Sequence, residues 1–277
     1  MRYLNLGCGD RFHPDWENLD LYPTSPAVRA WDLRKKTPFA DETFDVVYHS
    51  HVLEHFPRRL GFALLQECHR VLKPGGAIRV AVPDLERIAR LYVEALDKAS
   101  NGVPGWDRKH EWMITEMYDQ CVREHSGGSF ADYHFYGSPP DFEFILERWG
   151  TYGTESARGL LDQGLRQPSG PPPKRAWGYV LHNPGKVLLN KLGKTVMGAA
   201  NWEALRVGRF RQAGEVHKWM YDRRSLAGIL EKAGFVNPRK VGPTESAVQN
   251  WASFSLDTDP DGSVYKADSM YMEALKP

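Results

Sequence analysis

Short β-branched or aromatic runs alternate with a segment of helical periodicity across the N-terminal third of this chain, and this alternation constrains its fold more than any other feature. Such a pattern is typical of βαβ units, in which crossovers join parallel strands. The runs with the length and composition of strands are 3–6, 17–21, 28–33, 44–49 and 76–82. We therefore expect an α/β fold built on a Rossmann-like, doubly wound and mostly parallel sheet.

Helix signals fall between and after these runs. One helical face carries Leu60, Leu64, Cys68, Val71 and Leu72, and the turn sequence Pro74-Gly75-Gly76 is expected to end that helix. Asp84 and Asp222 each precede an amphipathic segment, where a carboxylate can accept the first free backbone N–H groups of a helix. Residues 235–241 and 269–275 have strand composition, so we expect the sheet to end in an antiparallel hairpin.

The sequence changes character between residues 100 and 214, where aromatic, histidine and glycine side chains are interleaved without a sustained period. We expect a single domain over residues 1–277, in which 100–214 is a large insertion, or lid, over the active edge of the sheet, and 215–277 adds the C-terminal helix and strand pair. Within the insertion, residues 174–211 carry eight basic side chains against one acidic side chain. This stretch is either a solvated helix face or a cationic cover for an anionic or membrane-associated acceptor.

The overall charge disfavours partners that are recognised by bulk electrostatics. The chain has 36 Lys and Arg against 35 Asp and Glu, a formal net charge of +1, so we expect no nucleic-acid partner. Its three cysteines are too few and too scattered for a disulfide framework or a zinc cluster. Because no window has the apolar length of a transmembrane segment, we expect a cytoplasmic protein; its oligomeric state is left open.

A strand that ends in Gly-x-Gly is the first candidate for a ligand site, in the sequence Leu4-Asn5-Leu6-Gly7-Cys8-Gly9. Glycines let a ligand lie against the backbone, where it can accept the N–H groups. A dinucleotide fingerprint would need a third glycine where the chain has Phe12, which disfavours NAD and FAD. Asp20, at the end of the second run, is placed to accept both hydroxyls of a ribose.

Five motifs occur in order between residues 2 and 86. They are Leu-x-Leu-Gly-Cys-Gly, Asn-Leu-Asp, Asp-Leu, Phe-Asp-Val-Val with His-Val-Leu-Glu-His, and Leu-Lys-Pro-Gly-Gly-Ala-x-x-Val. In this order and at these strand ends, they resemble the class I S-adenosylmethionine-dependent methyltransferases, and among them the type 11-like group. The resemblance implies a methyltransferase with S-adenosyl-L-methionine as its cofactor.

The resemblance also implies a cofactor site at the carboxyl ends of the strands, with Asp20 on the ribose and Asp32 on the adenine amino group. The full set expected to contact the cofactor is Asn5, Gly7, Cys8, Gly9, Asp20, Leu21, Asp32, Leu33, Ser50 and His51, the last two beside the sulfonium. Two departures stand out. Asn5 occupies a position where the family often has an acidic residue, and the short segment from Gly9 to Asn18 leaves no room for a full crossover helix.

Methyl transfer to a hydroxyl needs alignment and a base, and histidine suits that role near neutral pH. His217 is the first candidate because the chain returns there from the insertion to the sheet, just before the predicted helix. The other candidates are His51, His125 and His134. The alternative for each histidine is a structural or surface role. The segment from His51 to His55 also matches a zinc-protease pattern, but that pattern needs an uninterrupted helix and a third ligand, so we expect no metal.

Together these observations favour O-methylation. The expected acceptor is a small molecule, a sugar or glycan, or a secondary metabolite, and it can be anionic. A looser resemblance to enzymes of glycan and natural-product biosynthesis, in Met220-Tyr221-Asp222 and Pro260-Asp261-Gly262, supports this ranking. The alternatives are an RNA or protein methyltransferase, a cofactor-binding module without catalysis, and a zinc hydrolase.

Overall fold

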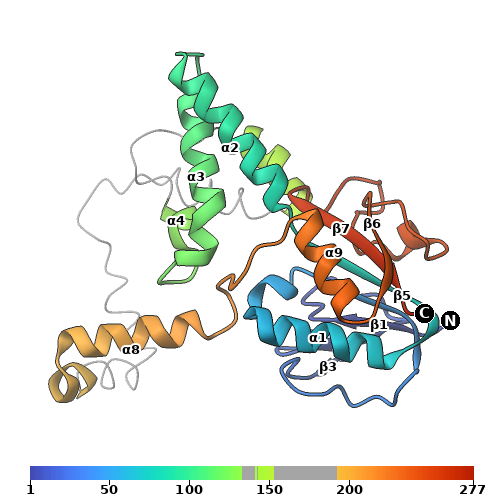
Figure 1. Ribbon diagram of the computed structural model, residues 1–277. Helices are drawn as coiled ribbons and strands as arrows, with labels where there is room; N and C mark the ends of the chain where they lie inside the picture. Colours follow the sequence, from blue (N-terminus) through green and yellow to red (C-terminus); the bar gives the residue numbers. More distant parts are fainter. Residues whose placement is uncertain (133–140, 142, 153–191) are drawn as a thin grey trace.

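The computed structural model describes residues 1–132, 141, 143–152 and 192–277, and a seven-stranded sheet forms its centre (Figure 1). The strand order is β3-β2-β1-β4-β5-β7-β6. The strands are β1 (Tyr3–Leu6), β2 (Glu17–Asp20), β3 (Val28–Ala30), β4 (Phe44–Ser50), β5 (Leu72–Pro83), β6 (Val236–Val241) and β7 (Ser269–Leu275). Strands β1 to β5 pair in parallel, whereas β7 runs antiparallel to both β5 and β6. The mostly parallel, Rossmann-like sheet predicted from the sequence is confirmed.

Strand β3 and helix α1 both end earlier than the sequence-based expectation. Strand β3 ends at Ala30 rather than Leu33, so Asp32 lies in the loop beyond it. Helix α1 (Arg58–Val71) ends before the Pro-Gly-Gly turn, because Leu72 is already extended and pairs with Phe44 of β4. The positive φ of Gly75 (76°) then bends the chain within β5 instead of ending the helix.

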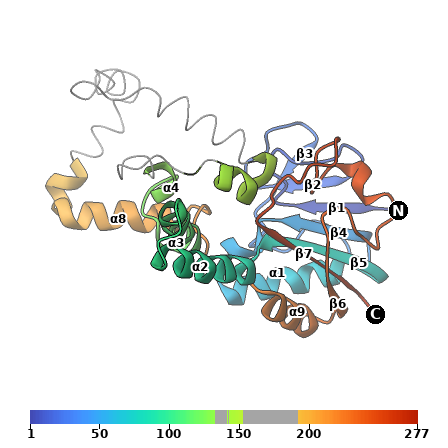
Figure 2. The ribbon, with the colours of Figure 1, turned by 90° about the horizontal axis from the view of Figure 1, so that it is seen from above.

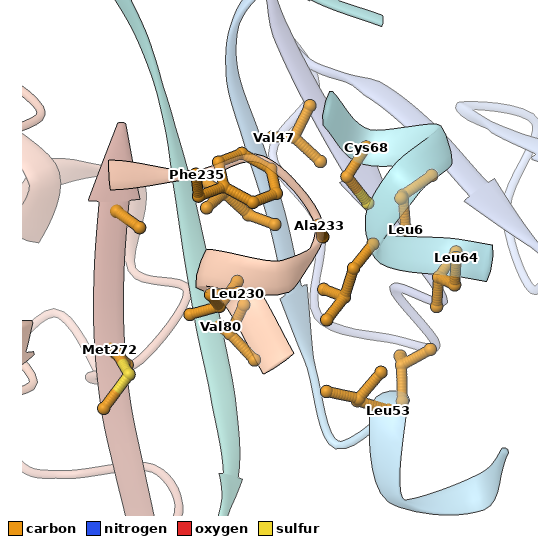
Figure 3. Packing of buried hydrophobic residues seen from close by; sticks show 14 of the residues in the cluster. Leu6, Val47, Leu53, Leu64, Cys68, Val80, Leu230, Ala233, Phe235 and Met272 are labelled. Carbon is orange, nitrogen blue, oxygen red and sulfur yellow. The ribbon is translucent and has the colours of Figure 1, made fainter. Parts of the chain in front are cut away.

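One face of the sheet is covered by α1 and by α9 (Arg223–Lys232), and the main core lies beneath them (Figure 3). Leu64 and Cys68 from α1 and Leu230 from α9 meet strand residues such as Val47 and Val80, and all are almost fully buried. The spacing of the α1 residues follows the helical face expected from the sequence. Deleting one such leucine side chain costs about 2–5 kcal/mol in well-packed cores.

The opposite face carries aromatic loops in place of long helices. Residues 7–43, all of which are described, contain no helix, because the connections between β1, β2, β3 and β4 are short. Trp16, Tyr48 and Trp251 pack there instead, the last from the 3₁₀ helix η3 (Trp251–Phe254). The irregular first crossover predicted from the Gly9–Asn18 spacing is therefore confirmed, and it leaves the carboxyl end of β1 open.

Helices also form where the sequence showed no sustained period. Helix α3 (Trp106–Val122) is one of these; it packs beside α2 (Leu85–Ser100), the helix predicted after Asp84, and both project from the sheet (Figures 1 and 2). Helix α4 (Gly128–Asp132), helical residues 143–152 and α8 (Ala199–Arg211) follow. Their own core includes Ile88, Trp112 and Phe144. A buried ion pair between Glu116 and Arg148 joins α3 to residues 143–152. Residues 174–191, with four of the eight basic side chains of the basic stretch, and His134 lie outside the described residues.

Both predicted helix caps are present. Asp84 accepts a hydrogen bond from Arg87 N (3.1 Å) at the start of α2, and Asp222 forms a capping box with Ser225 at the start of α9. The three cysteines are free thiols. Among the described residues, no helix is both long and apolar enough to cross a membrane.

Candidate functional site

The Gly-x-Gly turn after β1 leaves its backbone open to a ligand. Gly7 and Gly9 have φ values of 64° and 53°, which side chains with a Cβ rarely adopt. A Cβ on Gly7 would lie 2.5 Å from Val52 Cγ2, so the packing itself requires glycine. A Cβ on Gly9 would meet nothing within 4 Å, so space remains beside this residue. The turn thus combines a tight contact with the core at Gly7 and room for a ligand at Gly9.

A cavity of about 210 Å³ opens at this turn, at the carboxyl ends of β1 and β4. Its lining residues are Asn5, Gly7, Cys8, Gly9, Asp10, Arg11, Tyr48, Ser50, His51, Tyr152, Leu256, Tyr265 and Lys266. The structure therefore brings together six of the residues expected at the cofactor: Asn5, Gly7, Cys8, Gly9, Ser50 and His51. Burial raises the pKa of the Cys8 thiol to about 12, so this cysteine is an uncharged wall of the cavity.

Asp20 lies next to the cavity and is fixed by the glycine turn. Its Oδ2 accepts a hydrogen bond from Gly9 N (2.9 Å), and its Oδ1 accepts one from Tyr22 N (2.8 Å). A carboxylate has about four acceptor sites, so both oxygens keep capacity for two ligand hydroxyls. The exposed side chains of Leu21 and Tyr22 follow directly, with 42% and 73% of their surface accessible. Asp20 is thus held rigidly beside an exposed apolar shelf.

Asp32 is less available than the sequence suggested. Arg34 engages it bidentately, with Nε 2.8 Å from Oδ1 and Nη2 2.8 Å from Oδ2. The hydrogen bonds from Arg34 hold the pKa of this carboxyl below its usual range, although partial burial opposes the shift. Leu33, next to Asp32, packs against the main core and lies near Gly7. Neither residue lines the cavity.

His51 is held in a strained conformation at the floor of the cavity. Its φ is 52°, uncommon for a residue with a side chain, and its backbone N–H donates to Ala81 O (2.9 Å) beyond the end of β4. The ring lies between two partners: Nε2 is 2.7 Å from Ser269 Oγ, and Nδ1 is 3.1 Å from Glu54 Oε1. The position of both ring nitrogens is therefore fixed.

The far wall of the cavity comes from residues that sequence reasoning missed. Tyr265 and Lys266 precede β7, and Tyr152 ends the helical residues 143–152. The rings of Tyr152 and Tyr265 are 5.6 Å apart, and the Arg11 guanidinium lies 4.0 Å from the Tyr265 ring centroid. Arg11 is fixed in turn by Asp259 (2.6 Å). The cavity mouth is therefore aromatic and cationic.

His217 does not line this cavity but joins a second polar cluster behind His51. This cluster consists of Glu54, His55 and His217, each of which offers a ligand atom within 4.8 Å of the other two. Burial lowers the pKa of His217 to about 3, with Glu54 opposing the shift, so the ring is neutral near pH 7.

His125 lies away from both groups. It follows α3 at the protein surface, with its Nδ1 3.2 Å from Ser126 O. Of the candidate catalytic histidines that the structure describes, His51 alone therefore lines the cavity, and His217 lies beyond Glu54, behind His51. The zinc-protease pattern is broken as expected, because a positive φ at His51 precedes the short 3₁₀ helix η1 (Leu53–His55).

Comparison with known families gives the decisive observation. Residues 18–80, which span β2 to the middle of β5, match a family model described as a methyltransferase domain. This match agrees with the class I S-adenosylmethionine-dependent methyltransferases that the five motifs resemble. The seven-stranded sheet is mostly parallel and ends in an antiparallel strand pair, as expected from the sequence. No curated protein matches the chain.

Solved structures with a related arrangement are distant in sequence. A SAM-dependent methyltransferase from Archaeoglobus fulgidus is 12% identical over 99% of this chain and 86% of its own, with a TM-score of 0.38. A SAM-dependent methyltransferase from Thermotoga maritima is 12% identical over 100% of this chain and 82% of its own length, with a TM-score of 0.37. A protein studied for the conversion of a disulfide bond into a thioacetal group during echinomycin biosynthesis is 23% identical over 34% of this chain, with a TM-score of 0.27. The chain spans about half, 49%, of that protein's length.

Proposed function

We propose that this methyltransferase transfers the methyl group of S-adenosylmethionine to a hydroxyl oxygen of a sugar-like or other small-molecule acceptor. The observation that carries the proposal is the cavity in which the glycine turn, His51 and the cationic, aromatic wall meet. We expect residues 100–214 to contribute to the acceptor pocket, since Tyr152 belongs to both.

The residues beside the glycine turn fit the cofactor. The space beside Gly9 suits the methionyl part, and Asp20, anchored on Gly9 N, would hold the ribose hydroxyls. The cavity of about 210 Å³ is smaller than most ligand pockets. The adenosine would therefore extend past Asp20 onto the exposed shelf of Leu21 and Tyr22, which it would cover.

His51 is the base in this proposal. Glu54 fixes its Nδ1, which leaves Nε2 to accept a proton once an acceptor hydroxyl replaces the Ser269 hydroxyl. When bound, the cofactor supplies a methyl group activated by positive sulfur. The acceptor oxygen bonds to the methyl carbon, its proton passes to His51 Nε2, and the electron pair of the broken C–S bond remains on sulfur.

The mouth of the cavity favours small acceptors with a ring face or a negative charge. Tyrosine rings pack against the apolar face of a saccharide, and their hydroxyls can hydrogen-bond to it. Arg11 and Lys266 line the same cavity, so a phosphate or carboxylate on the acceptor would find a cation there. This mouth would suit intermediates of glycan or natural-product synthesis in the cytoplasm.

The test is transfer of a labelled methyl group from S-adenosylmethionine to matched panels of free sugars, phosphorylated sugars and amines. We expect product with hydroxyl acceptors, and a fall of about 100-fold or more in turnover for His51→Ala with cofactor affinity nearly intact. His69→Gln, on the far end of α1, is the control with unchanged turnover. Transfer to amines alone, or equal rates in His51→Ala, would overturn the acceptor class or the assignment of the base.

A further inference from the structure

In the cluster of Glu54, His55 and His217, Glu54 and His217 are buried and His55 is partly buried, yet several of the polar atoms lack partners. Glu54 is fully buried and His217 is 4% exposed. Among the described residues, Glu54 Oε2, His55 Nδ1 and His217 Nδ1 have no hydrogen-bond partner, and Glu54 Oε1 is approached only by His51. A buried unpaired polar group costs about 1–3 kcal/mol, and more when it is charged. Several unpartnered polar atoms within one cluster would destabilise the fold considerably, which indicates that a ligand forms the missing interactions with them.

The surrounding backbone holds the cluster together from two distant segments. Lys218 N and Trp219 N donate to the Glu54 carbonyl oxygen at 2.6 and 3.2 Å, which docks the segment after His217 onto η1. His217 N donates to Gln120 O (2.9 Å) from the other side. The rings of His55 and His217 meet edge to face, with centroids 4.8 Å apart. The three side chains are therefore fixed before any ligand binds.

Neighbouring cations do not occupy the position. The Lys218 ammonium donates to Arg211 O instead, and Arg123 is paired with Asp119 and Glu215. The cluster thus offers one carboxylate and two imidazole nitrogens with no described lysine or arginine paired to them. Two imidazoles and a carboxylate form a ligand set typical of zinc and related divalent transition metals, whereas magnesium and calcium prefer oxygen ligands alone.

We propose that Glu54, His55 and His217 bind one divalent transition-metal ion of the zinc class, directly behind His51. Three protein ligands leave a coordination position for water or an acceptor oxygen, as in catalytic rather than structural zinc sites. Glu54 would then serve both groups, one oxygen toward the metal and one toward His51 Nδ1. This proposal replaces our sequence-based expectation of no metal; only the role of the site in catalysis rests on the proposed function.

The site is testable by Co²⁺ titration of the full-length, chelator-treated protein, followed by visible absorption. We expect one equivalent of Co²⁺ to bind with the intense bands of a four-coordinate site and to be displaced by one equivalent of Zn²⁺. Glu54→Gln and His217→Ala should each weaken binding at least 100-fold. His69→Gln, which alters a histidine on α1 outside the cluster, should keep the wild-type spectrum and affinity.

Calorimetry with S-adenosylmethionine on the same samples separates the two proposals. Cofactor binding without any Co²⁺ bands would overturn the metal site and leave water as the partner of these atoms, with the proposed function intact. Co²⁺ bands that persist in both variants would place the metal elsewhere and also overturn the assignment. Metal binding without cofactor binding would support the site while contradicting the proposed function. Circular dichroism of each variant confirms that it is folded.

Discussion

Two buried charged clusters on opposite faces of the sheet differ in how completely they are paired. Arg79 of β5 donates to Asp257 Oδ2 and Glu273 Oε1, both at 2.8 Å, and its remaining N–H groups reach the carbonyl oxygens of residues 242, 243 and 245. Glu54 and its histidines, by contrast, keep unpartnered atoms among the described residues. Glu54 and His217 are as fully buried as the Arg79 cluster, and His55 is partly buried, so burial alone does not explain the difference.

The comparison separates a fully paired, structural cluster from one that we propose binds a ligand. Buried charges hold a fold together only when their hydrogen-bonding capacity is used, and the Arg79 cluster uses all of it. It also joins β5 and β7 to the loop of residues 242–257. The Glu54 cluster lies behind the cavity and retains capacity for a ligand. Unpaired buried groups thus mark the site more clearly than buried charge alone.

Replacing Arg79 tests the structural half of this comparison and carries the largest expected effect. In Arg79→Met, Asp257 and Glu273 stay buried without their shared cation, so we expect the free energy of unfolding to fall by about 3–5 kcal/mol. Urea denaturation of wild type and Arg79→Met measures this difference in the free energy of unfolding. Arg90→Met, whose exposed side chain pairs with Glu86 on α2, should cost less than about 1 kcal/mol. Equal losses in the two variants would contradict the structural role.

Glu273→Gln gives an intermediate effect that depends on pH. Hydrogen bonds from Ser246, Ala247 N and Arg79 lower the pKa of this carboxyl, against the effect of burial. We expect a loss of about 1.5–3 kcal/mol at pH 7. Because the folded pKa lies below the unfolded one, the carboxylate stabilises the fold above the unfolded pKa, and that contribution is lost as the pH falls through the folded pKa.

The stability gap between wild type and Glu273→Gln should therefore narrow as the pH is lowered from 7 toward 3. Urea denaturation at several pH values measures this gap. A gap that stays constant, or widens in acid, would contradict the assigned direction of the pKa shift.

Glu54→Gln is the same substitution in the other cluster and should have the smallest effect on stability. Without metal, the buried carboxylate has no full set of partners, and a neutral amide is cheaper to bury than a charge. We expect the free energy of unfolding of the metal-free protein to change by less than about 1 kcal/mol, or to rise. A loss as large as that of Glu273→Gln would mean that the Glu54 cluster is structural after all.

The sheet could be predicted from the sequence because its signals are local. Each parallel strand is a short apolar run, and the capping side chains of Asp84 and Asp222 lie next to the helices they cap. Helix α3 was missed because its stability depends on distant contacts. Glu116 pairs with Arg148, which is 32 positions away, and the hydrophobic periodicity of the sequence does not indicate such a distant contact.

The glycine-turn side of the cavity, where we propose the cofactor, could be found from the sequence for the same reason, and the opposite wall could not. Gly7, Gly9 and Asp20 lie in one short N-terminal stretch with a recognisable motif. The mouth of the cavity joins Arg11 to Asp259, which is 248 positions away, and the proximity of His217 to Glu54 depends on the docking of two separate segments. The Pro260-Asp261-Gly262 turn, already noted in the sequence, was the one local signal near this wall.

The most direct test of the account is calorimetric titration of the folded, metal-stripped protein with S-adenosylmethionine and S-adenosylhomocysteine. We predict binding that weakens by about 1.5–3 kcal/mol in Asp20→Ala, which is roughly 10- to 150-fold in the dissociation constant. Asp15→Ala, whose side chain is 84% exposed nearby, should bind like wild type. The absence of binding by the folded wild type, or equal affinity in Asp20→Ala, would contradict the assignment of this cavity and its carboxylate as the cofactor site.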